Sequence, residues 1–169
     1  ALIGENGIGK TTLIKEIMQQ HNSIKINPNV KIGYFSQDFT NLNMHTSIIE
    51  NVMKDTNQSE VFVKNILANL LFKDKDLDKK IKDLSGGERV KVSIAKILVS
   101  ESNLLLLDEP TNSLDIASIE ALEDLLKKYN GTILLVTHDK TFIDHIATDI
   151  WMIKNHKIEE YEGNYSSYL

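Results

Sequence analysis

The fold is decided near the start of the chain, by Ile3-Gly4-Glu5-Asn6-Gly7-Ile8-Gly9-Lys10-Thr11-Thr12. Its glycines let backbone N–H groups converge on one point, and the N-terminus of a following helix adds a potential that favours an anion. After the loop, apolar residues recur at the spacing of one helical face, at Leu13, Ile14, Ile17 and Met18. The stretch therefore predicts a strand, a phosphate-holding loop and a helix, in that order. The alternative is a glycine-rich turn that binds nothing.

Two residues at the end of this loop carry its chemistry. Lys10 is expected to reach the β- and γ-phosphates of a nucleotide, and the hydroxyl of Thr11 is expected to ligate Mg²⁺. Gly4, Gly9, Lys10 and Thr11 fill every defined position of the phosphate-loop pattern. The loop therefore predicts a nucleotide site.

Apolar runs and helical stripes alternate along the rest of the chain. We expect strands at Val30–Phe35, Leu104–Leu107 and Thr132–Thr137, and the leucine run suits a strand that is covered on both faces. Helices are expected from Ser85 to Leu98 and around Ile119 to Leu126. Strands that alternate with helices predict an α/β fold with a mostly parallel, doubly wound sheet.

The interval before Ser85 has a different pattern. From Thr46 to about Lys82 the apolar residues fall at helical spacing, which predicts a small helical subdomain, over about residues 45–83, inserted into the α/β core. Near the end of the chain we expect two short strands, Asp149–Ile153 and Lys157–Tyr161, joined by a turn at Asn155-His156. At 169 residues the whole chain is the size of one domain.

Composition narrows the functional classes. The formal net charge of -5 gives no overall basic footprint, so composition alone predicts no contact with nucleic acid or an anionic membrane. The chain has no cysteine, which fits a reducing compartment and excludes disulfides and cysteine-ligated metal sites. No apolar run approaches the roughly 20 residues needed to cross a bilayer. We therefore expect a cytoplasmic protein without direct membrane contact.

Polar side chains follow three of the predicted strands. Asp108-Glu109 ends the leucine run, Gln37 follows the strand that ends at Phe35, and His138 follows the strand that ends at Thr137. Ligands of open α/β sheets bind at the carboxyl ends of the strands, so these residues are candidates for a shared site. Each also has a plainer interpretation: a solvated acidic turn, a polar loop residue or a structural histidine.

The pentapeptide Leu84-Ser85-Gly86-Gly87-Glu88 stands between the loop and the acidic pair. With these motifs in this order, the chain resembles the nucleotide-binding domain of the ATP-binding cassette (ABC) superfamily, which consists of P-loop NTPases. The resemblance implies an ATPase that uses ATP and Mg²⁺, with Asp108 at the water shell of the metal and Glu109 polarising the attacking water. It also implies that Gln37 ligates the metal or senses the γ-phosphate, and that His138 contacts the γ-phosphate.

In that superfamily two cassettes pack head to tail, which gives the pentapeptide a role. The Ser85 hydroxyl, the N–H groups of Gly86 and Gly87, and the helix N-terminus would then face the nucleotide held by the other cassette. Asp115 matches a loop that communicates across the same dimer. Ser85 and Glu88 also fit a capping box, and both interpretations can hold together. The implied partner is a second cassette, on the same chain or in a homodimer.

The start of the chain departs from the superfamily pattern. Cassettes usually carry an antiparallel β-subdomain ahead of the loop, with an aromatic residue that stacks on adenine, yet only Ala1-Leu2-Ile3 precede Gly4. We therefore expect a fragment of a longer protein that lacks this subdomain, with weakened recognition of adenine.

Three segments narrow the subfamily: Leu107–Asp115, Thr137–Ile143 and Tyr161–Leu169 resemble the ABC-F family. Its members carry two cassettes on one chain, lack membrane domains and act on the ribosome. One departure is Ser113, where the family usually has histidine. The resemblance implies a ribosome-associated translation factor, or a member of the subgroup that protects ribosomes from antibiotics, with the ribosome and tRNA as partners.

Two other functions are compatible with a cassette. The first is the ATP-binding subunit of an ABC membrane transporter, whose helical subdomain is usually longer than the compact interval between Gln37 and Ser85. The second is a chromosome-maintenance ATPase, which would need a long coiled coil between the loop and the pentapeptide, and the sequence has none there. The compact interval favours the ribosomal role.

Overall fold

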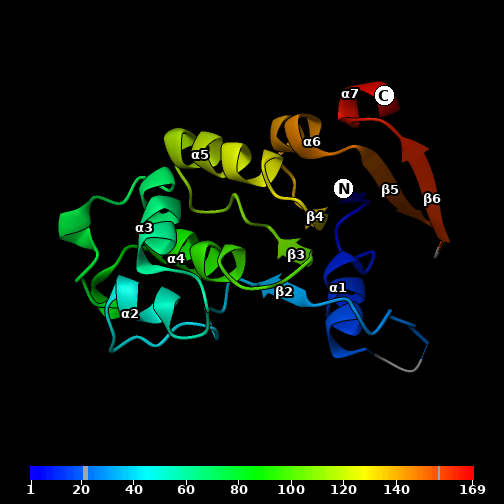
Figure 1. Ribbon diagram of the computed structural model, residues 1–169. Coiled ribbons are helices and arrows are strands. Elements are labelled where there is room, and N and C mark those ends of the chain that lie inside the picture. Colours follow the sequence, from blue (N-terminus) through cyan, green and yellow to red (C-terminus); the bar gives the residue numbers. More distant parts are fainter. Residues whose placement is uncertain (21–22, 156) are drawn as a thin grey trace.

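The computed structural model describes residues 1–20, 23–155 and 157–169 (Figure 1). His21, Asn22 and His156 lie outside these ranges, so the turn expected at Asn155-His156 is described only in part. The strands are β1 (Leu2–Ile3), β2 (Ile32–Phe35), β3 (Leu104–Asp108), β4 (Thr132–Val136), β5 (Asp149–Lys154) and β6 (Lys157–Glu162). Each predicted strand is present, although β2 begins two residues later than expected.

The strands pair mostly in parallel, as predicted. β2, β3 and β4 form one parallel sheet, in which Phe35 lies opposite Leu107 and Asp108 lies opposite Val136. β1 pairs in parallel with β5, and β5 pairs antiparallel with β6. β1 also contacts β4, so the two sets of strands lie next to each other. The carboxyl ends of β2, β3 and β4 therefore lie at one edge of their sheet, because these three strands share one direction.

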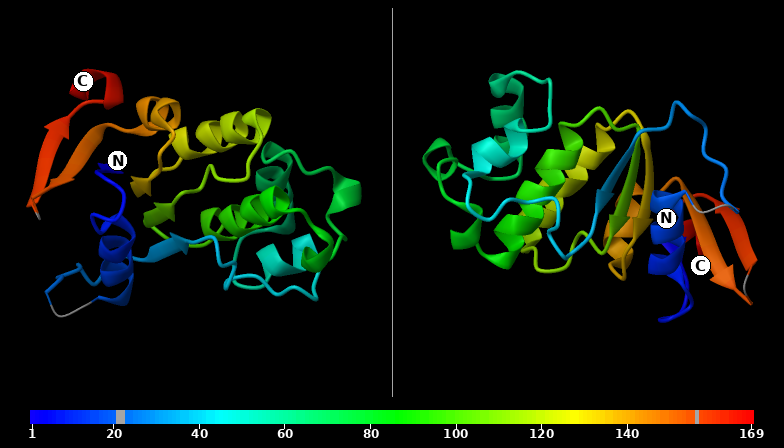
Figure 2. Two further views of the ribbon diagram at one scale, coloured as in Figure 1. Left: turned by 180° about the vertical axis from the view of Figure 1, so that it is seen from behind. Right: turned by 90° about the horizontal axis from the view of Figure 1, so that it is seen from below.

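Helices cover both faces of the strands, which confirms the doubly wound arrangement. α1 (Lys10–Gln19) lies on one face, and α4 (Gly86–Leu98), α5 (Ile116–Lys127) and α6 (Lys140–Ile146) lie on the other (Figure 2). β3 separates the two cores by alternation: Leu106 packs with Ile14 of α1, whereas Leu105 and Leu107 pack with the other helices. The leucine run is thus buried from both sides, as its composition predicted.

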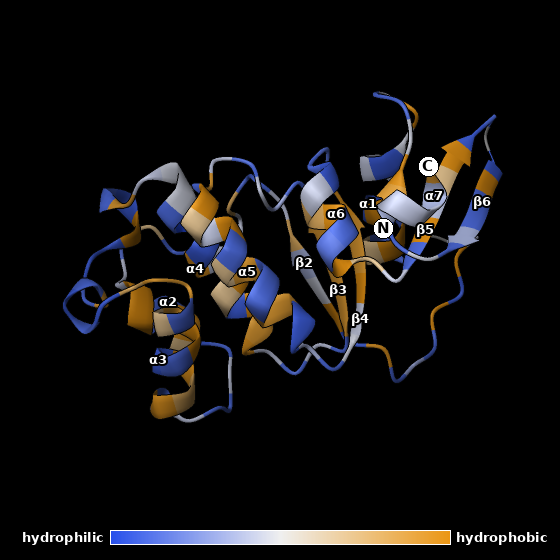
Figure 3. Ribbon diagram, turned by 90° about the horizontal axis from the view of Figure 1, so that it is seen from above, coloured by the Kyte–Doolittle hydropathy of each residue, from blue (hydrophilic) through white to orange (hydrophobic). Residues whose placement is uncertain are grey.

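The segment between β2 and α4 forms the inserted helical part. It contains α2 (Ile48–Met53), α3 (Glu60–Asn69) and two 3₁₀ turns, Asp74–Asp76 and Ile81–Asp83. Its core also includes Val92 and Ala95, which lie on a second face of α4, and Val99, which caps the end of that helix. Figure 3 shows α2 and α3 at one end of the molecule and the hairpin of β5 and β6 at the other. α4 therefore belongs to both cores and joins them.

Some local expectations were incomplete. The helical spacing expected from Thr46 to about Lys82 does not hold throughout, because Leu71 lies beyond the end of α3, with φ 68°, and is half exposed. Two short helices were not predicted, α6 and α7 (Tyr165–Tyr168). Both begin after a side-chain cap, Asp139 and Asn164 respectively, and such caps favour a helix start even where the apolar pattern is short. Within the described ranges, none of the helices has the length and apolar character needed to cross a membrane.

Candidate nucleotide-binding site

The glycine-rich loop joins β1 to α1 and holds the side chain of Lys10. Gly7 and Gly9 have φ values of 79° and 108°, which L side chains rarely adopt. The Lys10 Nζ donates hydrogen bonds to the carbonyl oxygens of Gly4 (2.7 Å) and Glu5 (3.0 Å), and the residue is only 8% exposed. An ammonium group has three N–H donors. The loop therefore fixes the Lys10 cation and leaves one donor for a ligand.

α1 differs from the other α-helices of the described ranges at its N-terminus. Its N-cap, Gly9, makes no side-chain cap hydrogen bond. A side-chain oxygen caps each of the others, from Ser47, Ser59, Ser85, Asp115, Asp139 and Asn164. The first N–H groups of a helix have no partner within it, and here they include those of Lys10, Thr11 and Thr12. These donors and the helix dipole together suit a bound anion.

The carboxyl ends of the strands bring three of the predicted site residues together. Glu109 Oε1 lies 3.3 Å from His138 Nε2, and Glu109 Oε2 accepts a hydrogen bond from the backbone N–H of His138 at 3.3 Å. The Gln37 side-chain amide donates to the carbonyl oxygen of Glu109 at 3.4 Å. The Glu109 side chain is 17% exposed, whereas that of His138 is 63% exposed. The carboxylate is therefore held by the histidine at the edge of solvent.

Buried contacts set the spacing between Glu109 and His138. The Glu109 backbone N–H donates to the carbonyl oxygen of Val136 at 2.7 Å, and Glu109 has φ 53°, which is unusual for a residue with a side chain. Next to it, the hydroxyls of Thr111 and Thr137 share a buried hydrogen bond of 3.1 Å. The residues that follow β3 are thus tied to the end of β4 by one backbone hydrogen bond and one side-chain hydrogen bond.

The pentapeptide forms the N-terminus of α4, as its capping pattern predicted. The Ser85 Oγ accepts from the N–H of Glu88 (3.2 Å), and the Ser85 N–H donates to Glu88 Oε2 (2.8 Å), which completes a capping box. Ser85 is exposed and its hydroxyl acts here as an acceptor, so its proton can be donated to another group. A Cβ on Gly87 would lie 2.5 Å from the Ser113 carbonyl oxygen, so only glycine allows this approach.

Asp115 closes the loop that begins at Ser113. Its carboxylate accepts from the N–H of Ser118 at 2.8 Å and caps α5. Hydrogen bonds from Ser118 hold the pKa of Asp115 below its ordinary value of 3.8. The contact of Gly87 with Ser113 therefore places this loop beside the pentapeptide.

The predicted residues fall into two groups. Gly4, Glu5, Ile8, Lys10 and His138 line one cavity of about 650 Å³, between the loop and α6. Asn6 and Gly7 lie exposed on the loop, and Asp108 ends β3 beside Glu109. Ser85, Gly86 and Gly87 lie instead at the start of α4, where Gly87 approaches the Ser113 loop. The first group lies around the loop and at the end of β3, and the second presents polar groups on an exposed helix end.

Oxygen donors are available for a hard cation. Thr11 contributes a hydroxyl, Asp108 a carboxylate and Gln37 an amide oxygen, the ligand types that Mg²⁺ prefers. In the part of the chain that the structure describes, no group of three or more His, Cys, Asp or Glu residues is placed to hold a metal ion. The donor set therefore fits Mg²⁺ that is bound partly by water and phosphate oxygens, as this ion commonly is.

The family described as "ABC transporter" matches residues 1–112, which is more than half of the 169 residues. The chain belongs to the ABC transporter family. This cassette is 41% identical to the ATP-binding protein Uup of Buchnera aphidicola subsp. Acyrthosiphon pisum over 177 residues, covering 99% of the chain and 30% of Uup. It is 39% identical to the erythromycin resistance ATP-binding protein MsrA of Staphylococcus epidermidis over 160 residues, covering 95% of the chain and 33% of MsrA.

Uup and MsrA are members of the ABC-F family, so the relatives of this cassette include that branch. The chain spans about a third or less of the length of these relatives. A solved dimer, the post-hydrolysis state of the ATP-binding cassette MJ0796 bound to ADP and Pi, aligns with a TM-score of 0.77. The alignment covers 95% of this chain and 83% of the other at 23% identity, and it establishes the fold of an ABC ATPase cassette.

Several contacts of the site are not predicted by the sequence pattern. Glu109 and His138 were predicted as site residues without their contact, and no role was predicted for Thr111, Thr137 or the approach of Gly87 to Ser113. The register of β3 against β4, which places Asp108 opposite Val136, brings these residues together. Strand pairing is a long-range feature that the local sequence pattern does not carry. The clearest sequence signal for one of these contacts was the pair of glycines in the pentapeptide, because glycine allows another segment of the chain to approach closely.

Proposed function

We propose that this cassette binds ATP with Mg²⁺ and hydrolyses it to ADP and phosphate. The observation that carries the proposal is the N-terminus of α1, which has a buried lysine and no side-chain cap where the other helices have one. The phosphates would accept hydrogen bonds from the N–H groups of the loop, of Thr11 and of Thr12, and from the remaining donor of Lys10. These donors place the negative charge of the phosphates where the helix dipole stabilises it.

Thr11, Asp108 and Gln37 would hold the metal ion. Mg²⁺ would supply neutralisation of the charge that develops on the phosphate oxygens. Because Gln37 also donates to the Glu109 carbonyl oxygen, it would connect the metal to the catalytic edge. The resemblance to cassettes assigns Asp108 to the water shell rather than to direct contact.

Glu109 would polarise the attacking water, and His138 would contact the γ-phosphate. Their contact of 3.3 Å fixes the carboxylate against a group that can donate a hydrogen bond. A carboxylate in a fixed position orients water without a large rearrangement, which is how phosphoryl transfer is accelerated. The two residues therefore act as one unit on one side of the γ-phosphate.

A second cassette would complete the site from the other side. The exposed Ser85 hydroxyl and the N–H groups of Gly86 and Gly87 would donate to the γ-phosphate held by the partner's loop, and Asp115 would lie at the same interface. The partner is a cassette on the same chain in the full-length protein, or a second copy of this one. The solved MJ0796 assembly, which is dimeric, supports this arrangement.

The finer function that we propose is that of an ABC-F ribosome-associated translation factor or ribosome protection protein. Support comes from the identity of 41% and 39% to Uup and MsrA and from the compact interval of α2 and α3. ATP would close the pair of cassettes and hydrolysis would release it, which would switch contacts with the ribosome and tRNA in the cytoplasm. We further propose that residues 1–169 act as one domain, with residues of about 45–83 as its helical subdomain.

Glu109→Gln tests the proposed ATPase directly. In the full chain, with the matching glutamate of its second cassette also changed to glutamine, Glu109→Gln should leave the Kd for Mg-ATP within about twofold and lower kcat on the order of 100-fold or more, because a positioned base contributes that much. Glu120→Gln, on the exposed surface of α5, is the matched control and should retain wild-type turnover. Turnover that survives Glu109→Gln would remove this carboxylate from the mechanism. Co-sedimentation of the full-length protein carrying Glu109→Gln and the matching change in its second cassette with ribosomes in ATP, rather than with membranes, would favour the ribosomal role over the transporter.

A further inference from the structure

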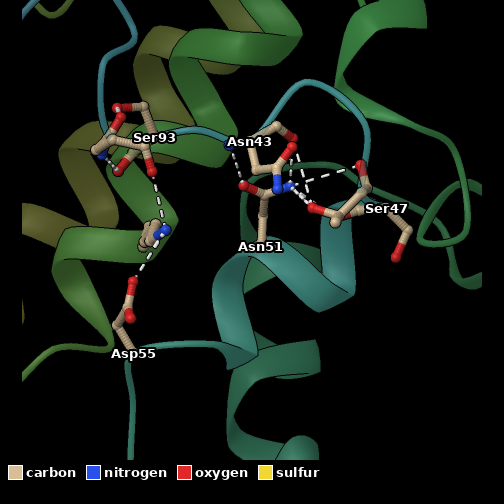
Figure 4. A network of polar contacts seen from close by, with 8 residues as sticks. Asn43, Ser47, Asn51, Asp55 and Ser93 are labelled. Carbon is tan, nitrogen blue, oxygen red and sulfur yellow. Dashed lines mark hydrogen bonds and ion pairs between the residues drawn. The ribbon is translucent and has the colours of Figure 1, made fainter.

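The segment that follows Gln37 is fastened to α4 by two buried side chains. The Ser93 Oγ donates to the side-chain oxygen of Asn41 at 2.9 Å, and the Lys96 Nζ donates to the Asn41 carbonyl oxygen at 2.8 Å. Ser93 is fully buried, and the Lys96 side chain is 13% exposed. Figure 4 draws this chain of contacts from Ser93 to Asp55. Asn41 is therefore held through both its side chain and its backbone.

Lys96 also reaches the end of α2. Its Nζ lies 3.1 Å from Asp55 Oδ2, and the Asp55 side chain is 62% exposed. A lysine that is mostly withdrawn from water requires partners for its donors. Here one partner is the Asn41 carbonyl oxygen and the other is an acidic side chain at the surface. The cation therefore bridges α4, α2 and the segment after Gln37.

A second anchor holds the same segment a few residues further on. The buried Asn51 of α2 donates to the Asn43 carbonyl oxygen (3.0 Å) and to the Thr46 Oγ1 (2.6 Å), and it accepts from the Asn43 N–H (2.8 Å). Figure 4 shows Asn43 and Asn51 facing each other. Residues 41–46 are thus immobilised on the helical part and not on the strands.

Only a short turn separates this anchored segment from Gln37. Asp38 closes the turn, because its Oδ1 accepts from the Ser36 hydroxyl (2.6 Å) and from the Thr40 N–H (3.3 Å). Gln37 itself donates to the Glu109 carbonyl oxygen. Only residues 38–40 lie between Gln37 and Asn41, so a displacement of Gln37 would also move Asn41. Because Asn41 is bonded to Ser93 and Lys96, the displacement would then reach α4, which begins directly after Ser85.

We propose that Lys96 and Ser93 are positioning residues for Gln37, which keep Gln37 and the N-terminus of α4 in a fixed relation during ATP hydrolysis. The inference deepens the proposed function and rests on it. Neither side chain touches the nucleotide, since both act on Gln37 through Asn41. Their role differs from general stabilisation, because it depends on the presence of the Gln37 side chain.

Steady-state kinetics on the full chain tests the inference, with the catalytic glutamate of the second cassette changed to glutamine in every protein compared. Lys96→Met keeps the stem of the side chain and removes both polar contacts; it should lower kcat by about fivefold while KM for ATP stays within about twofold, since couplings along such networks are of this size. Ser93→Ala should also lower kcat. Lys96→Arg, which can donate to both partners, should restore kcat to within about twofold of wild type.

The control is Lys31→Met. Lys31 pairs with Glu101 at 2.7 Å, at the opposite end of β2 from Gln37, and both side chains are about 60% exposed. This change should leave kcat unchanged. Thermal unfolding of every variant shows whether it folds, and if Lys96→Met does not fold, Ser93→Ala carries the same comparison.

The decisive step is to repeat the changes in a Gln37→Ala background. If Lys96 and Ser93 act through Gln37, neither change lowers kcat any further there. An equal fold-loss with and without the Gln37 side chain would assign the two residues a merely structural role and overturn the inference, as would a wild-type kcat for Lys96→Met and Ser93→Ala. Absence of ATP turnover in the wild-type protein would instead overturn the proposed function.

Discussion

The N-termini of α1 and α4 are built in opposite ways, although both are candidates for contact with phosphate. α1 begins at Gly9, without a side-chain cap, and has a buried lysine as its first residue. α4 begins at Ser85, whose capping box with Glu88 satisfies its own backbone. Glycine in place of a capping side chain costs a helix only a few tenths of a kcal/mol. The difference indicates that α1 keeps its donors for a ligand held by this chain, whereas α4 folds without one and offers an exposed hydroxyl.

Of the changes that test this contrast, removal of the Lys10 side chain should have the largest effect. Lys10→Ala is expected to weaken Mg-ATP binding on the order of 10- to 100-fold, because a hydrogen bond to a charged group contributes about 1.5–3 kcal/mol. Isothermal titration calorimetry with Mg-ATP measures the Kd. Lys15→Ala, at an exposed position of the same helix, is the control and should bind normally. Equal affinity of the Lys10 variant and the control would show that the loop is not the phosphate site.

A mixture of two inactive proteins tests whether α4 acts in trans. Lys10→Ala removes the loop function and Ser85→Arg blocks the helix end, so each is expected to be inactive alone, while a heterodimer keeps one intact composite site. Turnover in the mixture should recover to a fraction of wild type. Ser59→Arg replaces the cap of α3 in place of that of α4, and serves as the control because the loss of a cap there should not affect turnover. Full activity of Ser85→Arg as a monomer would contradict a role in trans.

The starts of α1 and α4 could be predicted from the sequence, whereas contacts between distant segments could not. The loop, the leucine run of β3 and the Ser85 capping pattern are local signals, and they predicted the strand, the helix starts and the doubly wound sheet. The 3₁₀ turns and α6 were missed because their apolar patterns are too short to have a period. The contact of Glu109 with His138 depends on the register of β3 against β4, which no local pattern specifies.

A smaller effect, on the pH dependence of the unfolding free energy, is expected from the cap of α5. This cap is Asp115, which can titrate, whereas Gly9 of α1 cannot. Hydrogen bonds from Ser118 lower the pKa of Asp115 in the folded protein, so its contribution to stability is present above the unfolded value of 3.8 and is lost as the pH falls through the folded pKa. Asp115→Asn keeps a capping oxygen that does not titrate. The difference in unfolding free energy between the two proteins should therefore change below about pH 4 and stay constant above about pH 6. A difference that is independent of pH would contradict the cap.

Amide hydrogen exchange, followed residue by residue by NMR, tests the central contrast most directly. On addition of Mg-ATP, the N–H groups of Lys10, Thr11 and Thr12 should become protected by about tenfold or more, because they gain an acceptor. The N–H of Glu88, already bonded to Ser85, should not change. Protection at Glu88 without protection at Lys10, Thr11 and Thr12 would contradict the assignment of the phosphate site to α1.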